Sequence, residues 1–332
     1  MSKTVYNGTA APFISNLSGV TLTNTNIDAS TSNLINYNRP VNTFVAVASS
    51  TSTAAYSTNG ITWTAIPMPS IANWYSVTYG NGTFVTVASS SAKAAYSTNG
   101  ITWTATTMPS SASWYSVAYG NGTFAAITSS STTAAYSTNG ITWTVTTLPS
   151  SSSWQTVTYG NGNFLVVCNG ATAAAYSTNG ITWTATTLPS SSSWYTVTYG
   201  NGTFVAITNG TTTAAYSTNG VTWTATTLPS SAYWQTVTYG NGNFLVVCNG
   251  ATAAAYSTNG ITWATSTMPS SSSWYTVTYG NGNFVVISNY QTSAAYSTNG
   301  ILWTATTMPA ASSWLGLTYG APTESVRFLQ TL

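Results

Sequence analysis

The sequence has very few charged residues and no histidine. Its 332 residues include four Lys or Arg and two Asp or Glu, whereas about a quarter of an ordinary soluble domain is charged. The two acidic residues, Asp28 and Glu324, are far apart in the sequence and so provide no obvious pair of carboxylates for acid–base catalysis. Metal sites use clusters of His, Cys, Asp or Glu, and the sequence has no such cluster. We therefore expect no catalytic residues, no metal and no cofactor.

The sequence also gives little support for a nucleic-acid or membrane partner. Its net charge is +2, which is too small to indicate a basic surface that binds nucleic acid or anionic lipid. A membrane-spanning helix needs roughly 18 apolar residues in a row, whereas the longest apolar runs, such as residues 164–168, have the length of a strand. The first residues lack the apolar core of a secretory signal. We expect either no export by that route or export as part of a larger particle.

Internal repetition is the strongest positive signal in the sequence. The pentapeptide Tyr-Ser-Thr-Asn-Gly occurs seven times with a constant period of 40 residues, from Tyr56 to Tyr296. A Trp follows three residues after each Gly, and a second Trp lies eleven residues further on, so that the two series contain all 14 Trp residues. Hydrophobic residues make up 43% of the chain, which is enough for a sizeable core. The seven copies fill residues 41–320.

Each repeat is predicted to form four short strands. In the second copy these are residues 74–79, 83–88, 94–97 and 101–104, which are rich in β-branched, aromatic and small residues. Asn-Gly between two such runs is a strong hairpin signal, because both central residues take positive φ. Four strands per repeat are typical of a β-propeller. We therefore predict an all-β fold, a seven-bladed β-propeller with four-stranded blades of 40 residues whose two faces are both buried against neighbouring blades.

Residues 57–63, Ser-Thr-Asn-Gly-Ile-Thr-Trp, and their six copies form a turn motif. The motif resembles that of the Asp-box, or bacterial neuraminidase repeat, family, whose pattern is Ser-x-Asp-x-Gly-x-Thr-Trp. Here it is one residue shorter before Gly, and Asn replaces Asp in every copy. The resemblance implies a structural motif on the turn between the third and fourth strands of a blade, with residues 74–79 innermost and residues 101–104 outermost. By this count residues 314–319 complete the first blade beside residues 43–48 and close the ring.

The two ends of the chain do not follow the repeat. Residues 1–40 and 321–332 contain five of the six charged residues. We predict that residues 1–40 are an attachment or oligomerisation extension and that residues 321–332 are a C-terminal tail; loosely ordered tails are the alternative. Cys168 and Cys248 lie at equivalent positions two repeats apart. Because a disulfide needs Cα atoms within about 7 Å, we expect two buried, unbonded thiols.

Comparison of the seven copies with one another indicates a candidate binding face. The Gly-Asn-Gly and Ser-Thr-Asn-Gly turns, which belong to one face of a propeller, are nearly invariant, whereas the second-to-third loops and the blade-to-blade loops of the other face differ between copies. Binding residues tend to lie on loops over a rigid scaffold; drift among tolerant loops is the alternative. Position 75 and its equivalents also alternate between Tyr and Gln. The candidate ligand-binding residues are Asn73, Lys93, Asn169, Asn209, Tyr233, Asn249, Tyr290 and Gln291.

We predict a non-enzymatic structural or binding module of a virus particle, in particular a phage tail or surface protein that contacts host glycans or other virion subunits. The composition, rich in Ser, Thr, Asn and Gly and poor in charge, resembles that of phage tail-fibre proteins, and a near-neutral surface suits a subunit held in an assembly. The predicted localisation is the virion, with other virion proteins bound through the termini. The alternative is a stand-alone, secreted, extracellular, lectin-like propeller that gains avidity from several sites. A sialidase-like glycosidase is disfavoured, because glycoside hydrolysis ordinarily uses two carboxylates and no repeat contains one.

Overall fold

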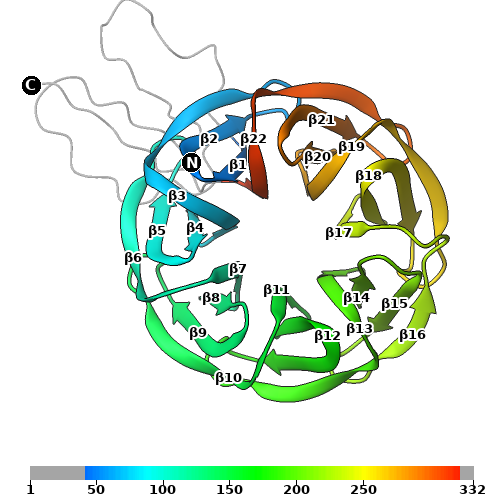
Figure 1. Ribbon diagram of the computed structural model, residues 1–332, viewed down its shortest axis with the longest axis horizontal. Helices are drawn as coiled ribbons and strands as arrows, with labels where there is room; N and C mark the ends of the chain where they lie inside the picture. The colour runs from blue at the N-terminus through cyan, green and yellow to red at the C-terminus, as the bar shows by residue number, and fades with distance from the viewer. Residues whose placement is uncertain (1–41, 322–332) are drawn as a thin grey trace, which may run out of the picture. The chain divides into compact units, whose positions relative to one another are not determined.

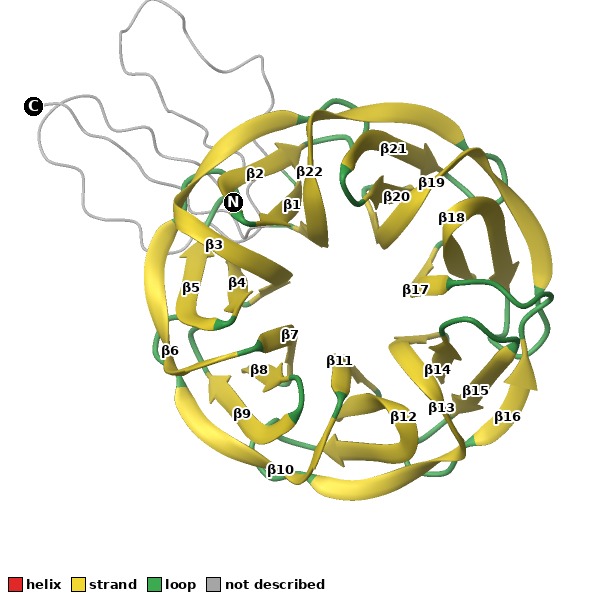
Figure 2. Ribbon diagram, in the orientation of Figure 1, coloured by secondary structure: helices red, strands yellow, loops and turns green. Residues whose placement is uncertain are grey.

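A computed structural model describes residues 42–321, and the regular secondary structure of this part consists of β-strands joined by turns (Figure 2). The strand pairs are antiparallel, so the predicted all-β class is confirmed. Within these residues there is no helix that is long and apolar enough to cross a membrane. The predicted attachment segment, residues 1–40, and the predicted tail, except for its first residue, lie outside the described residues.

The strands in chain order are β1 (Thr43–Ser49), β2 (Thr51–Ser57), β3 (Thr64–Gly80), β4 (Thr83–Ser89), β5 (Ser91–Ser97), β6 (Thr104–Ala112), β7 (Trp114–Gly120), β8 (Thr123–Thr128), β9 (Ser131–Ser137), β10 (Thr144–Ser152), β11 (Trp154–Gly160), β12 (Asn163–Ser177), β13 (Thr184–Gly200), β14 (Thr203–Thr208), β15 (Thr213–Ser217), β16 (Thr224–Thr227), β17 (Trp234–Gly240), β18 (Asn243–Ser257), β19 (Ala264–Gly280), β20 (Asn283–Ser288), β21 (Gln291–Ser297) and β22 (Thr304–Gly320).

The strands are arranged in repeated antiparallel groups around a common centre (Figure 1). In the second repeat the inner part of β3 pairs with β4, β4 pairs with β5, and β5 pairs with β6. This is the order predicted for one repeat. We number the repeats as unit 1 (43–72 together with 314–320), unit 2 (74–112), unit 3 (114–152), unit 4 (154–192), unit 5 (194–232), unit 6 (234–272) and unit 7 (274–312). A joint is named by the two units that meet there, for example joint 1/2.

Long strands connect neighbouring units. Residues 64–67 of β3 pair with β2 at the outer edge of unit 1, and residues 73–80 of the same strand pair with β4 near the centre of unit 2. β13, β19 and β22 span two units in the same way and, like β3, have 17 residues. Because these strands continue from unit to unit, the hydrogen-bonded sheets contain twelve, six and four strands and are not separate four-stranded sheets.

The last strand of the described chain pairs with the first. β22 is bonded to β1 in a register that runs from Thr43 opposite Gly320 to Ser49 opposite Ser313. The earlier part of β22, residues 304–307, pairs instead with β21 of unit 7. β22 therefore contributes the outer strand of unit 7 and the inner strand of unit 1, which is the pairing expected from the repeat count.

The core consists of seven apolar clusters, one at each joint. At joint 2/3, for example, Met108 of unit 2 packs with Trp114 of unit 3, whose indole is fully buried. The Trp114 indole N–H also donates to the carbonyl of Ser110 at 3.0 Å, which fixes the connection that leads into its strand. Both faces of each sheet are therefore buried, as predicted. Cys168 and Cys248 are buried and unbonded, which confirms the prediction for the thiols.

The turns explain why the repeat motifs do not vary. In the Gly-Asn-Gly turn, Asn81 has φ of 48° and Gly82 has φ of 76°, as predicted for a two-residue hairpin. The preceding Gly80 is required for another reason, because a Cβ at this position would lie 1.9 Å from the Tyr119 ring of the next unit. The first Gly of the turn thus lets adjacent units approach closely.

The predicted outermost strand, residues 101–104, is wrong in its boundaries. β6 begins at Thr104, and the residues before it belong to the turn. The Asn99 side-chain oxygen accepts the backbone N–H groups of Ile101 and Thr102 at 2.8 and 2.9 Å, so these residues are held in the turn and do not pair with β5. The Ser97 hydroxyl accepts the N–H of Gly100 at 2.9 Å. The predicted structural role of the motif's Ser and Asn side chains is confirmed.

Hydroxyl groups of the outer strands form hydrogen bonds between neighbouring units. Thr106 of unit 2 donates to the carbonyl of Ile141 in unit 3 at 2.7 Å, and Thr306 of unit 7 donates to the carbonyl of Ile61 in unit 1 at 2.6 Å. Joint 1/2 differs, because the equivalent residue there is the buried, apolar Ile66. The equivalent donors at the other joints are Thr146, Thr186, Thr226 and Ser266.

Candidate functional site

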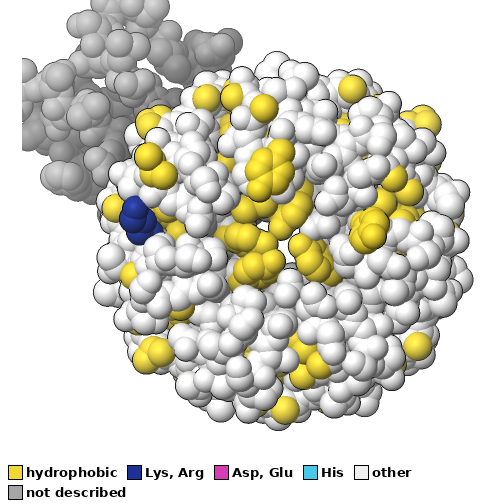
Figure 3. All heavy atoms as spheres, in the orientation of Figure 1, with side chains coloured by type: hydrophobic (Ala, Val, Ile, Leu, Met, Phe, Trp, Pro, Cys, Tyr) yellow, Lys and Arg dark blue, Asp and Glu magenta, His cyan; other side chains and the backbone are white. Residues whose placement is uncertain are grey.

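The variable loops lie together on one face. The hydroxyls of Ser49 and Ser50, in the turn between β1 and β2, donate to the side-chain oxygen of Asn73 at 3.1 and 3.0 Å. Asn73 belongs to the connection from unit 1 to unit 2, so second-to-third turns and unit-to-unit connections contact each other. We call the face formed by these two kinds of loop the variable face. Figure 3 shows it as an almost uncharged surface with hydrophobic side chains gathered at its centre.

A groove on the variable face brings together two of the predicted binding residues. It has a volume of 310 Å³ and lies at joint 1/2. Lys93 lines it, and the Lys93 ammonium group donates to the carbonyl of Ile71 at 2.7 Å. The Lys93 side chain of unit 2 is therefore bonded to the connection that leads from unit 1 to unit 2. The groove residues used below are Ser50, Ile71, Asn73, Ser89, Ser90 and Lys93.

Joint 5/6 holds a second group of predicted residues. The backbone N–H of Asn249 donates to the carbonyl of Tyr233 at 2.9 Å, and the Tyr233 side chain is 67% exposed. Asn209 has a structural contact, because its side-chain amide donates to the carbonyl of Trp234 at 3.3 Å. Tyr233 is thus the one exposed side chain of these three residues, since Asn209 and Asn249 are half-buried.

The remaining predicted residues lie at other joints. Tyr290 is 74% exposed and has φ of 60°, and the neighbouring Gln291 accepts a hydrogen bond from the hydroxyl of Ser272 in unit 6. Asn169 lies at joint 3/4, where its backbone N–H donates to the carbonyl of Ser153 at 2.9 Å. The eight predicted residues therefore occupy several positions around the variable face and do not form one site.

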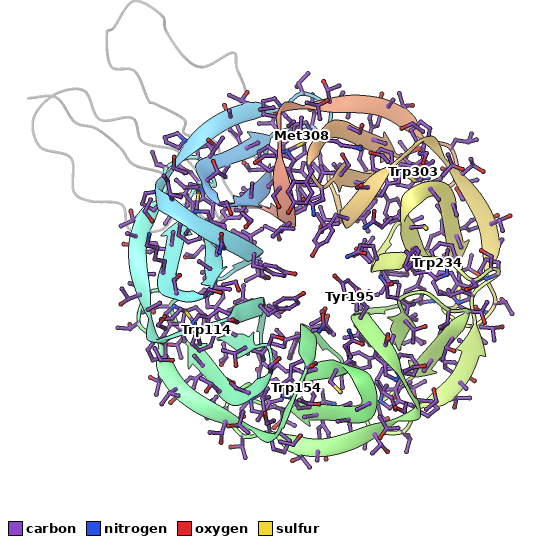
Figure 4. All side chains as sticks on the ribbon, viewed as in Figure 1. Trp114, Trp154, Tyr195, Trp234, Trp303 and Met308 are labelled. Carbon is purple, nitrogen blue, oxygen red and sulfur yellow. The ribbon has the colours of Figure 1, made fainter. Side chains whose placement is uncertain are left out.

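A central cavity of 170 Å³ is the feature that the sequence-based prediction missed. It is lined by the second residue of each innermost strand, and Figure 4 labels one of these side chains, Tyr195, near the centre around which the strands are arranged. The alternation of Tyr and Gln at position 75 and its equivalents was the available signal, but the sequence did not indicate that these side chains converge. The seven residues are Tyr75, Tyr115, Gln155, Tyr195, Gln235, Tyr275 and Leu315.

The phenols in the cavity form a hydrogen-bonded network. The Tyr75 hydroxyl donates to that of Tyr115 at 2.5 Å and lies 3.1 Å from that of Tyr275. The amide of Gln235 donates to the Tyr195 hydroxyl at 2.8 Å. The network lines the cavity with neutral hydroxyl and amide groups.

Burial raises the pKa of three of these phenols. It raises the pKa of Tyr115 from 10 to about 12, with a further contribution from the neighbouring Tyr195. Burial also raises the pKa of Tyr75 and of Tyr275, and nearby phenols add to both effects. Because a phenolate would be the basic or nucleophilic form, the cavity offers hydrogen bonding and ring contacts at neutral pH.

No protein-family model and no curated protein matches the sequence. Solved structures with the same kind of fold do match. A streptogramin B lyase structure aligns with a TM-score of 0.68 and 15% identity over 84% of this chain and 92% of that chain. Virginiamycin B lyase from Staphylococcus aureus aligns with a TM-score of 0.65 and 15% identity, over 76% of this chain and 93% of that chain. YCF48 from Cyanidioschyzon merolae has a TM-score of 0.58 and 15% identity, with 75% and 88% of the two chains covered.

These similarities define a β-propeller-like fold. At 15% identity they concern the fold alone. The Asp-box relationship and the virion role predicted from the sequence remain predictions.

Proposed function

We propose that the chain forms a closed, seven-bladed β-propeller that serves as a non-enzymatic binding module. Two observations support closure at joint 7/1: the pairing of β22 with β1, and the hydrogen bond from Thr306 to Ile61. An apolar cluster that includes Phe44, Val285 and Trp314 fills the same joint. In this arrangement every unit packs between two neighbours, and a rigid ring carries the variable loops.

The chemistry of the described chain favours binding over catalysis. Residues 42–321 contain no Asp, Glu or His, and Lys93 is their one charged side chain. Burial raises the pKa of Tyr75, Tyr115 and Tyr275 in the central cavity, and these three phenols are neutral at physiological pH. Among the structural neighbours, a virginiamycin B lyase variant with a histidine replaced by alanine is described as catalytically inactive. The present sequence has no histidine at all, so the fold similarity does not supply that chemistry.

The proposed setting is a virus particle, with host-surface glycan as the ligand and other virion proteins held through the two termini. Tyr, Asn and Ser side chains on the variable face provide the ring surfaces and neutral hydrogen bonds that suit saccharides. The observation that carries the proposal is the groove at joint 1/2, where two variable residues of the repeat, Asn73 and Lys93, line one cavity. A stand-alone extracellular lectin is the second candidate, because exposed residues such as Tyr233 and Tyr290 are spread around the ring and suit multivalent binding.

Two measurements test the proposal. Mass spectrometry of purified particles from the native source should detect the protein if it is a virion component, whereas secreted protein alone would favour the stand-alone lectin. Glycan-array and host-cell binding should be seen with the wild type and should fall in a folded Tyr233→Ala, Tyr290→Ala double variant. Unchanged binding by the double variant would remove the two Tyr residues from the site. Absence of binding by the wild type would leave a purely structural role.

A further inference from the structure

We propose that the groove at joint 1/2 recognises the anionic group of an acidic saccharide, a carboxylate or sulfate carried on a sugar ring. This inference rests on the proposed glycan-binding function of the variable face and names the ligand class of one site on it. It follows from three features of the groove: the three lining residues that depart from the repeat, the excess of hydrogen-bond donors, and the size and lining of the cavity.

Three residues of this groove depart from the repeat. Position 73 is Ser in five of the other units' connections, position 71 is Ser in five, and position 93 is Thr, Ala or Ser in all six other copies. At joint 1/2 these positions are Asn73, Ile71 and Lys93, and all three line the same groove. They come from two units and meet in one cavity, which gives this groove a lining that the other joints do not share.

The groove presents donors without matching acceptors. The Asn73 side-chain oxygen already accepts the hydroxyls of Ser49 and Ser50, so its amide N–H groups are left to donate, and no partner for them is found among residues 42–321. The Lys93 ammonium group donates one hydrogen bond, to the Ile71 carbonyl, and has three N–H donors in all. Residues 42–321 contain no carboxylate that could neutralise Lys93. A ligand with a negative, acceptor-rich group satisfies this arrangement.

The size and walls of the groove suit a sugar. Its volume of 310 Å³ is at the lower end of small-ligand sites, which hold roughly 300–1,000 Å³. Ile71 is 67% exposed beside it and supplies an apolar surface for the C–H face of a ring. Ser89 and Ser90 add hydroxyls that bond to sugar hydroxyl groups as donor or acceptor. The pairing of one cation with an apolar wall distinguishes this groove from the neutral joints, where no such cation is present among the described residues.

The test measures binding of three probes to the full chain by calorimetry: a sulfated disaccharide, a disaccharide containing a uronic acid, and the corresponding neutral disaccharide. The test variants are Lys93→Thr and Asn73→Ser, which install residues found at equivalent positions in other units. Lys93→Arg keeps the charge, and Thr133→Ala is the matched control at the equivalent position of unit 3. Circular dichroism and unfolding curves verify that each variant is folded.

We expect the wild type to bind at least one acidic probe about tenfold more tightly than the neutral one, with an affinity that falls as salt is added. Lys93→Thr should lose about tenfold in affinity for the acidic probe, the size of one charge-assisted hydrogen bond. Lys93→Arg should retain most of the affinity, and Thr133→Ala all of it. The sulfated and uronic-acid arms identify which anion the groove prefers.

The outcomes separate this inference from the proposed function. Equal binding of acidic and neutral probes, or an unchanged affinity in folded Lys93→Thr, would overturn the anionic site while leaving glycan binding by the variable face intact. Binding of none of the three probes would also overturn the anionic site. Failure of the wild type on the wider glycan array would, in addition, remove glycan binding itself.

Discussion

Tyr290 occupies a backbone conformation that disfavours a bulky residue. It is the second residue of the turn between β20 and β21, with φ of 60°, and the equivalent residue is Gly170, Gly210 or Gly250 in three units and Ser in the other three. The left-handed region costs a non-glycine residue about 1–2 kcal/mol, whereas Gly loses roughly 0.5–1 kcal/mol more in chain entropy on folding. The Tyr290 ring is 74% exposed, so its removal loses little burial. We expect Tyr290→Gly to raise the free energy of unfolding by about 0.5–1 kcal/mol.

The reciprocal substitution isolates the backbone contribution. A Cβ added at Gly170 meets no atom within 4 Å, and φ there is 79°, so Gly170→Ala introduces backbone strain without a steric clash. It should lower the free energy of unfolding by about 1 kcal/mol. Urea unfolding followed by tryptophan fluorescence measures both variants. If Tyr290→Gly is less stable than the wild type while Gly170→Ala behaves as expected, the Tyr290 ring stabilises the fold through contacts and the reasoning is refuted.

Three further predictions concern the ring and its centre. Trp314→Ala should lower the free energy of unfolding by about 3–5 kcal/mol, because the indole is fully buried at joint 7/1. Deletion of residues 312–332 should abolish cooperative unfolding. A stable truncated protein would contradict the role of β22 in unit 1. Thr306→Val should lower the free energy of unfolding, measured with urea, by about 1 kcal/mol, because the hydrogen bond to the Ile61 carbonyl is lost. An unchanged free energy of unfolding would mean that this bond makes no net contribution to stability. The stability contributed by Tyr115, whose folded-state pKa is raised from 10 to about 12, should be fully present below pH 10 and lost as the pH rises through 12. Tyr115→Phe should flatten this decline in unfolding measurements across that range, and an unaltered decline would exclude Tyr115 as its source.

Much of the fold could be predicted because the repeat carries the same physical signals seven times. The period of 40 residues gave four strands for each repeat, and the Asp-box resemblance gave their order from the centre outward. Counting on that basis paired residues 314–319 with residues 43–48, which is the pairing of β22 with β1. The boundary of the outermost strand could not be obtained in this way. Residues 101–104 have strand-like composition, but the Asn99 side chain accepts hydrogen bonds from the backbone N–H groups of their first residues and holds them in a turn. Composition does not show that a side chain, and not a neighbouring strand, will bind these N–H groups.

The candidate site was predictable only in part. Comparison of the copies identified Asn73 and Lys93 as unusual residues, but their meeting in one groove depends on how the connection from unit 1 crosses to unit 2. The same comparison gave equal weight to Asn209, which the structure places in a hydrogen bond with the backbone of Trp234. Sequence variation indicates where loops differ, whereas the division between ligand-facing and structural side chains depends on contacts between units.

The centre of the ring shows why near-identical repeats still need differences. Seven equivalent side chains converge on one cavity of 170 Å³, and two phenols already approach closely, with the rings of Tyr75 and Tyr115 4.1 Å apart. Tyr275 lies within hydrogen-bonding distance of the same Tyr75 hydroxyl, so further phenols at every position would compete for one space. Gln235 and Leu315 provide narrower or shorter side chains there, and Gln235 also supplies an amide donor to Tyr195. Packing at the axis, where all seven side chains meet, therefore accounts for one group of differences between copies. The recognition that we propose for the groove at joint 1/2 would account for another, because Ser and Thr stand at most of the equivalent positions of the other units.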